Sequence, residues 1–142
     1  MSNKAYKNLN IDRLPDRLSD SEVITYINTV RIGASQLEKF KKLSSRKDEV
    51  LSRWFNVSVR TFRNYKTTGA VLKTDIKEKL ILLLSLYKHG EEVFGSIEDF
   101  NAWLQEENFY FDGATPDSFL DTVSGIRFAE NRLTAIEYGD NV

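Results

Sequence analysis

The sequence predicts an all-α fold, with an N-terminal helix-turn-helix part followed by a small C-terminal helical part. Two observations predict it. Apolar residues recur every three or four positions along most of the chain, whereas the alternation typical of half-buried strands is scarce. Residues that favour helix starts and ends, mainly Ser, Thr, Asp and Gly, separate these periodic stretches at short intervals. A chain of 142 residues is long enough for one sizeable core, or for two small cores that share a boundary.

The chain opens with an extension, residues 1–19, ahead of the first predicted helix. That helix is capped within residues 19–21 and ends at Gly33. Its apolar positions are Val23, Ile24, Ile27 and Val30. Three further helices are predicted over residues 34–43, from a cap at Ser44 or Ser45 to Trp54, and over residues 59–66.

Residues 55–57 are the tight connection between the third and fourth helices, which is the spacing of a helix-turn-helix. Such a turn usually needs a residue with positive φ, and Asn56 is of one of the few types that tolerate it. Ser58 then caps the fourth helix. The residues predicted to face the core from that helix are Val59, Phe62 and Tyr65.

The opposite face of this helix carries hydrogen-bond donors of the kind that read DNA, because Arg pairs with guanine and Asn with adenine in the major groove. The candidate DNA-binding residues are Ser58, Arg60, Thr61, Arg63 and Asn64. Cations expected to anchor backbone phosphates are Arg46, Lys47, Arg53, Lys66 and Lys73. The alternative is an ordinary solvated helix face. Helical units of this type usually contact operators as dimers, so a homodimer is expected.

In the second half, Thr74 or Asp75 caps a strong apolar helix over residues 76–89, which Gly90 ends. Its apolar content makes it the predicted central core helix. Ser96 is predicted to cap a helix over residues 97–105, which is followed by a loop over 108–115. A short helix then starts at Thr115-Pro116 and stops at Gly125. The last helix covers residues 126–138 and ends at Gly139. Phe109, Tyr110 and Phe111 form an aromatic cluster in the loop, either at an interface or as a lid on the core.

Composition argues against several classes of function. Without Cys, the chain forms no disulfide, thiolate nucleophile or zinc-thiolate site, which agrees with a reducing cytoplasm. The longest apolar run, residues 80–87, is far shorter than the roughly 20 residues that span a bilayer, so no membrane association is expected. The single His, His89, is expected in the last turn of a helix as a complement to the helix dipole. No nucleophile-base pair or metal-ligand spacing is found, so neither enzyme activity nor a cofactor or metal is predicted.

Charge is distributed unevenly along the chain. Residues 1–74 contain 15 Lys and Arg against 7 Asp and Glu, a net charge of +8, whereas residues 75–142 contain 5 against 14, a net charge of -9. This asymmetry predicts a basic surface for a polyanion and an acidic surface for another partner. The alternative is that the two halves neutralise each other across an internal interface.

Five stretches of the chain carry a resemblance to a known family: VRIGASQLEKF at 30–40, NVSVRTFRNYKTTGAVL at 56–72, EEVFGSIEDFNAWL at 91–104, GATPDSFLDTVSG at 113–125 and RLTAIEYG at 132–139. Through them the chain, from about residue 20 to the end, resembles the Xre/MbcA/ParS group of bacterial antitoxins. The later stretches are the more specific ones, because a helix-turn-helix by itself is common. Asn56 stands where the family usually has the Gly of the turn.

The resemblance implies a helix-turn-helix DNA-binding part, here residues 20–73, and a toxin-binding part, here residues 74–142. It also implies a RES-domain toxin that consumes NAD as the partner, whose NAD site the last helix and tail of the antitoxin cover. Carried onto this chain, the toxin-binding candidates are Leu133, Glu137, Tyr138, Gly139, Asp140, Asn141 and Val142. For Leu133 the alternative, a core position, is the favoured interpretation. The competing interpretation is a free-standing transcription regulator whose acidic half dimerises or binds an effector.

Overall fold

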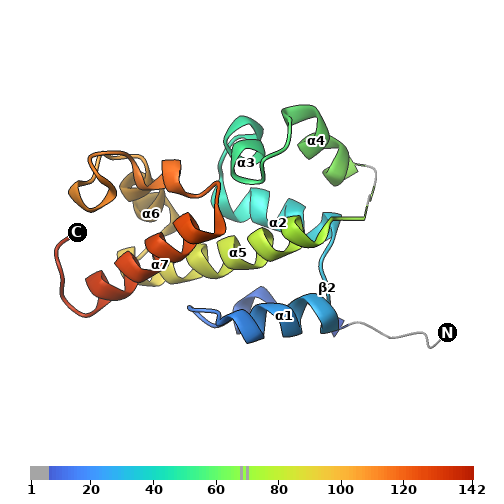
Figure 1. Ribbon diagram of the computed structural model, residues 1–142, viewed down its shortest axis with the longest axis horizontal. Helices are drawn as coiled ribbons and strands as arrows, with labels where there is room; N and C mark the ends of the chain where they lie inside the picture. Colours follow the sequence, from blue (N-terminus) through green and yellow to red (C-terminus); the bar gives the residue numbers. More distant parts are fainter. Residues whose placement is uncertain (1–6, 68, 70) are drawn as a thin grey trace.

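The computed structural model describes residues 7–67, 69 and 71–142, and nearly all of the regular secondary structure in this part of the chain is helical (Figure 1). The predicted all-α fold class is confirmed. The α-helices are α1 (Asp20–Thr29), α2 (Ala34–Ser44), α3 (Asp48–Trp54), α4 (Val59–Thr67), α5 (Thr74–Phe94), α6 (Ile97–Leu104) and α7 (Val123–Glu137). Single turns of 3₁₀-helix are η1 (Ile11–Arg13), η2 (Phe109–Phe111) and η3 (Pro116–Phe119), and two short parallel strands are β1 (Lys7–Asn8) and β2 (Val30–Arg31).

Helix α5 is the centre of the molecule, as its apolar sequence predicts. It contacts α1, α2, α6 and α7, and Figure 1 shows α7 lying along it. Leu80, Leu83 and Tyr87 on α5 are completely buried. The buried side chains of both sequence halves join one continuous hydrophobic cluster, so α5 is the element on which the helix-turn-helix and the C-terminal helices are both assembled.

The N-terminal segment packs against the same core. Leu9, Leu14 and Leu18 are buried, and the ammonium group of Lys88 on α5 donates to the carbonyl oxygens of Asp12 and Leu14, at 2.8 and 2.6 Å. The described part of the extension, residues 7–19, is therefore fastened along α5.

Helix α1 begins where the sequence predicts but ends early. Ser19 and Glu22 form the reciprocal hydrogen bonds of a capping box. The helix stops at Thr29 rather than at Gly33, because the backbone of β2 pairs with β1 instead. Ile24, predicted to face the core, is 59% exposed. Gly33 is the residue immediately before α2.

The predicted cap of α3 is wrong. Helix α3 begins at Asp48, and neither Ser44 nor Ser45 caps it. Ser45 adopts φ 56° at the end of α2, and the hydroxyl of Ser44 accepts a hydrogen bond from the Arg46 N–H at 3.3 Å. The predicted side-chain cap of α5 is also absent, since Lys73 precedes that helix without a capping hydrogen bond.

Gly90 does not end α5. The helix continues to Phe94 and ends at Gly95, which adopts φ 91°. Gly90 lies where α5 and α6 approach each other, and a Cβ atom built on it would stand 2.4 Å from Cγ of Phe100. The glycine is required by close packing rather than by a helix end.

Gly125 likewise lies inside a helix. Helix α7 starts at Val123, and the Thr122 hydroxyl caps it by accepting from the Gly125 N–H at 2.9 Å. A Cβ atom at Gly125 would stand 1.7 Å from the Phe119 carbonyl oxygen. The helix start predicted at Thr115-Pro116 is present, but it forms only the 3₁₀ turn η3.

Candidate functional site

The helix-turn-helix has the local structure that its sequence predicts. Asn56 adopts φ 55° in the turn between α3 and α4. The Ser58 hydroxyl accepts from the Thr61 N–H at 3.0 Å and donates to the Thr61 hydroxyl at 2.9 Å. The start of α4 is therefore fixed by its own side chains, and the Ser58 and Thr61 hydroxyls are already hydrogen-bonded to each other.

Helix α4 buries the side that the periodicity predicts. Phe62 is completely buried and stacks on Phe55, with ring centroids 6.0 Å apart. Arg60, Arg63 and Asn64 are exposed on the outer side. The donor-rich side of α4 is thus exposed, while Phe62 packs into the core.

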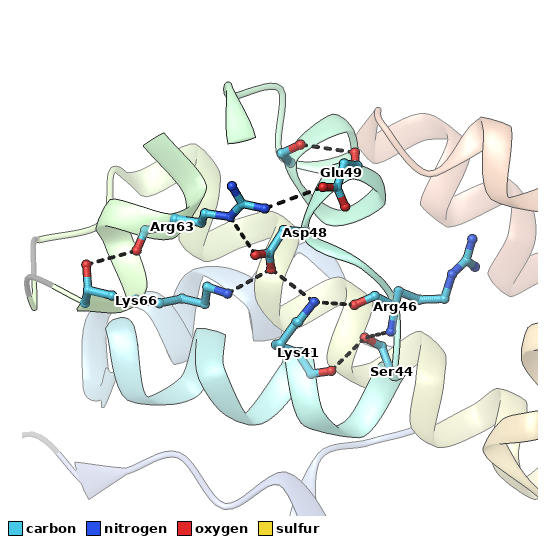
Figure 2. Close-up of polar contacts among 9 residues, drawn as sticks. Lys41, Ser44, Arg46, Asp48, Glu49, Arg63 and Lys66 are labelled. Atoms are coloured by element: carbon cyan, nitrogen blue, oxygen red, sulfur yellow. Dashed lines mark hydrogen bonds and ion pairs between the residues drawn. The ribbon is translucent and has the colours of Figure 1, made fainter. Parts of the chain in front are cut away.

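Asp48, the first residue of α3, forms ion pairs with three cationic side chains from two other helices (Figure 2). Its carboxylate is 3.0 Å from Nζ of Lys41 and 2.8 Å from Nζ of Lys66, and it accepts from Nε of Arg63 at 3.0 Å. The hydrogen bond from Lys66 is the largest cause that holds the pKa of Asp48 well below its usual range, against the opposing effect of burial. Asp48 therefore ties α4 to α2 and α3.

This network changes the expected roles of the nearby cations. The side chain of Lys66 is only 13% exposed and is paired with Asp48, and the Arg46 guanidinium is buried against Asp117. The expectation that Arg46 anchors phosphate is wrong, because its charge is used inside the molecule. Lys47, Arg53 and Lys73 are exposed, and their predicted phosphate contacts stay predictions.

The C-terminal candidates separate into core and surface. Leu133 is completely buried, in agreement with the core alternative, and Ile136 packs partly against the core. Tyr138, just past α7, is 84% exposed. Gly139 adopts φ 98° and ends the helix as predicted. The aromatic residues of η2 also include both a core and a surface position, since Phe111 is completely buried and Phe109 is 88% exposed.

Residues 140–142, which we call the tail, are held against the rest of the chain. Arg132 on α7 donates to the Asp140 carboxylate at 3.0 Å and to the Asn141 carbonyl oxygen at 2.8 Å. The Val142 main-chain oxygen accepts from the Trp103 indole N–H at 3.3 Å and from the Asn108 amide at 3.2 Å. The tail does not fray in this structure.

The carboxylate of Glu137 contacts the buried His89, although the Glu137 side chain is 44% exposed. Its carboxylate is 3.1 Å from Nε2 of His89, whose Nδ1 contacts the buried carboxylate of Glu130. Burial alone lowers the pKa of His89, but the hydrogen bonds and charges of the two Glu residues outweigh it and raise the pKa to about 9. His89 is therefore a buried imidazolium between α5 and α7, and its predicted role at a helix end is wrong because α5 continues past it.

The comparison with known families concerns the C-terminal part of the chain. Residues 89–139 match the model of the antitoxin Xre/MbcA/ParS C-terminal toxin-binding domain. The matched segment comprises 51 of the 142 residues and includes α6, η2, η3 and α7. It confirms the family resemblance for this segment, whereas the stretches before residue 89 lie outside it. No match was found among curated proteins.

Sequence reasoning missed Asp48, Arg132 and the pairing of His89 with Glu130. One available signal was the seven-residue spacing of Glu130 and Glu137, which places both carboxylates on one face of a helix opposite the single His. Arg132 gave no such signal, because its partners Asp140 and Asn141 lie beyond the end of α7 and approach it only when the chain turns back.

Within residues 7–67, 69 and 71–142, none of the helices combines the length and the apolar character that a bilayer requires.

Proposed function

We propose that the protein is an antitoxin that neutralises its partner by binding it through the end of α7 and the tail. The match of residues 89–139 to a toxin-binding domain is the observation that carries this proposal. The matched segment ends at Gly139, directly after Tyr138, the exposed aromatic residue just past α7. An exposed, rigid and amphipathic Tyr is a typical anchor of a protein interface.

The partner proposed is a RES-domain toxin that degrades NAD, as the family resemblance implies. In this account, Tyr138 and the tail occlude the NAD cleft of the toxin, so that NAD does not enter and the antitoxin performs no chemistry. A cleft that binds NAD phosphates must present cationic groups, and Glu137 and Asp140 supply carboxylates at the correct end of the chain. Both carboxylates are already paired within this chain, so their contribution requires an exchange of partners.

The test is rescue of growth during coexpression with the toxin encoded in the neighbouring reading frame. Removal of residues 138–142 is expected to abolish rescue, and this truncation retains the contact between Glu137 and His89. Tyr138→Ala is expected to reduce rescue more than Ile24→Ala, which removes an exposed apolar side chain of α1. Full rescue by the truncated chain refutes occlusion by this segment.

Operator binding is a second proposed activity, favoured by the positive φ of Asn56 and the exposed face of α4. A homodimer would place two such helices on a palindromic operator, and the antitoxin would thereby repress its own operon. The candidate contacts remain Ser58, Arg60, Thr61, Arg63 and Asn64. Arg63 must share its guanidinium between DNA and Asp48.

The test of this activity is a gel shift with operator DNA at fixed salt. Arg60→Ala combined with Asn64→Ala is expected to abolish the specific shift and to leave toxin neutralisation unchanged. Arg13→Ala combined with Asn28→Ala removes the same side-chain types from η1 and α1 and serves as the matched control. An unaltered shift with the α4 variant counts against DNA recognition by this helix.

A further inference from the structure

The chain turns back sharply at the end of α7. The Asp140 N–H donates to the Ala135 carbonyl oxygen at 3.0 Å, and the Gly139 N–H donates to that of Ile136 at 2.9 Å. With Gly139 at φ 98°, these are the two hydrogen bonds of a Schellman motif. The motif directs the tail back beside α7 and leaves Tyr138 at the outside of the bend.

Arg132 holds the tail in that position. Besides its hydrogen bonds to Asp140 and Asn141, its guanidinium stacks over the ring of Tyr110 in η2, 3.6 Å from the ring centroid. The Arg132 side chain is only 12% exposed. One guanidinium therefore joins three segments that are separate in sequence, namely α7, η2 and the tail.

Three exposed apolar side chains belong to η2, to the tail and to the residue just past α7. Phe109 of η2 is 88% exposed and Val142 of the tail is 61% exposed, in addition to Tyr138. Phe109 follows Asn108, whose side-chain amide donates to the Val142 oxygen. Exposed apolar side chains that form one contiguous patch are typical of binding surfaces.

We propose that Arg132 is a positioning residue, which holds the tail against η2 so that Phe109, Tyr138 and Val142 form one contact surface for the toxin. This inference rests on the proposed function and adds η2 to its contact surface. A tail that is already ordered loses little conformational entropy on binding, whereas a free tail must be ordered by the toxin itself. Arg132 thereby increases affinity without touching the partner.

The first measurement uses the antitoxin alone. Backbone NMR order parameters for residues 140–142 are expected near the rigid value of about 0.85 in the wild-type chain and below about 0.6 in Arg132→Gln. Asp140→Ala removes the carboxylate partner without disturbing the stacking on Tyr110, and it is expected to loosen the tail as well. Arg127→Gln removes a guanidinium that pairs with Asp20 at the other end of α7, so it serves as the control.

The second measurement is the Kd for the toxin. Arg132→Gln is expected to weaken binding at least about tenfold, Phe109→Ala to weaken it as well, and Arg127→Gln to leave it unchanged. In a chain that lacks residues 140–142, Arg132→Gln is expected to have no further effect. A purely structural role of Arg132 would weaken binding in the truncated chain too.

Three results for Arg132→Gln would overturn the inference. The first is a rigid tail, and the second is a mobile tail with an unchanged Kd for the toxin. The third is tighter binding of the toxin, which would mean that the contacts of Arg132 must break before the toxin binds. Each leaves the proposed function standing if Tyr138→Ala still weakens binding. Equal Kd values for the wild-type chain and Tyr138→Ala reject the proposed function, and failure of the wild-type chain to bind rejects both.

Discussion

His89 is the side chain whose environment differs most from the sequence-based expectation. It lies between Glu130 and Glu137 with only 2% of its surface exposed. Two carboxylates at hydrogen-bonding distance keep the imidazole protonated, and the resulting ionic contact joins the C-terminal part of α5 to the middle and the end of α7. The segment that precedes Tyr138 is thus fixed from inside the molecule.

The raised pKa of His89 predicts how stability depends on pH. Because the folded value, about 9, lies above the ordinary 6.5, the folded protein binds this proton more tightly than the unfolded chain does. The stabilisation is complete below pH 6.5 and is lost as the pH rises through 9. Urea unfolding between pH 6 and 9.5 is expected to show a decrease of about 2–3 kcal/mol in the free energy of unfolding.

His89→Gln is the control for this prediction. The chain has no other His and no Cys, so no second side chain of these types titrates in the same range. The variant is expected to lose the decrease between pH 6.5 and 9.5. An equal pH dependence in both proteins would show that another group is responsible.

Some single residues that act on the neighbouring backbone were predictable from sequence, although the caps predicted for α3 and α5 are not formed. Asn56 in the turn and the caps Ser58 and Ser96 act within three residues of their own position, so a local pattern is sufficient. Asp48 and Arg132 act through residues on other elements, and their partners are fixed only by the fold. Sequence analysis therefore did not predict the residues that position the side chains of the two candidate sites.

Among the elements, α5 shows where sequence rules for helix ends fail. A Gly after an apolar helical stretch usually indicates a C-cap. Gly90 instead permits the close approach of α6. The spacing of apolar residues along the sequence does not indicate such a contact between two helices. The existence of α5 was predictable, whereas its last five residues were not.

Gly90→Ala tests this explanation. Replacement of Gly by Ala inside a helix usually stabilises a protein by up to about 1 kcal/mol. Here the new methyl group would overlap the ring of Phe100, so a destabilisation of about 1–3 kcal/mol is expected in urea unfolding. Phe100→Leu in the same chain is expected to recover part of the loss. A stabilising effect of Gly90→Ala alone would contradict the close approach.

In the whole molecule, the helix-turn-helix is fastened to the C-terminal segment over a buried polar junction. Arg46 pairs with Asp117 at 2.8 Å, and the Trp54 indole N–H donates to the Asp117 carbonyl oxygen at 3.0 Å. The Asn56 amide and the Lys79 ammonium group both donate to the Asp121 carbonyl oxygen. The turn of the helix-turn-helix thus contacts the segment that leads into α7.

Asp117→Asn tests this junction. It leaves the buried Arg46 guanidinium without its carboxylate, so a loss of about 3–5 kcal/mol in the free energy of unfolding is expected. Asp121→Asn retains the carbonyl oxygen that the junction uses and is expected to change stability by less than about 0.5 kcal/mol. Equal effects of the two substitutions on the free energy of unfolding would contradict a stabilising role of the ion pair between Arg46 and Asp117.

The continuous core also bears on the division of the chain at residue 74, which stays a prediction. The buried residues on both sides of that position belong to one cluster around α5. We therefore expect the two parts to unfold in one cooperative transition, and calorimetry measures this directly. Two separate transitions would indicate independent domains.

Photo-crosslinking tests most directly the proposal that Tyr138 enters the NAD cleft of a toxin. Tyr138 is replaced by p-benzoylphenylalanine, the complex with the RES-domain toxin is irradiated, and the crosslinked peptides are identified by mass spectrometry, with Ile24 replaced in the same way as the control. The account predicts crosslinks from position 138 to residues that line the NAD cleft and none from position 24. Crosslinks from position 138 only to toxin surfaces outside that cleft, or crosslinks from position 24 alone, would contradict it.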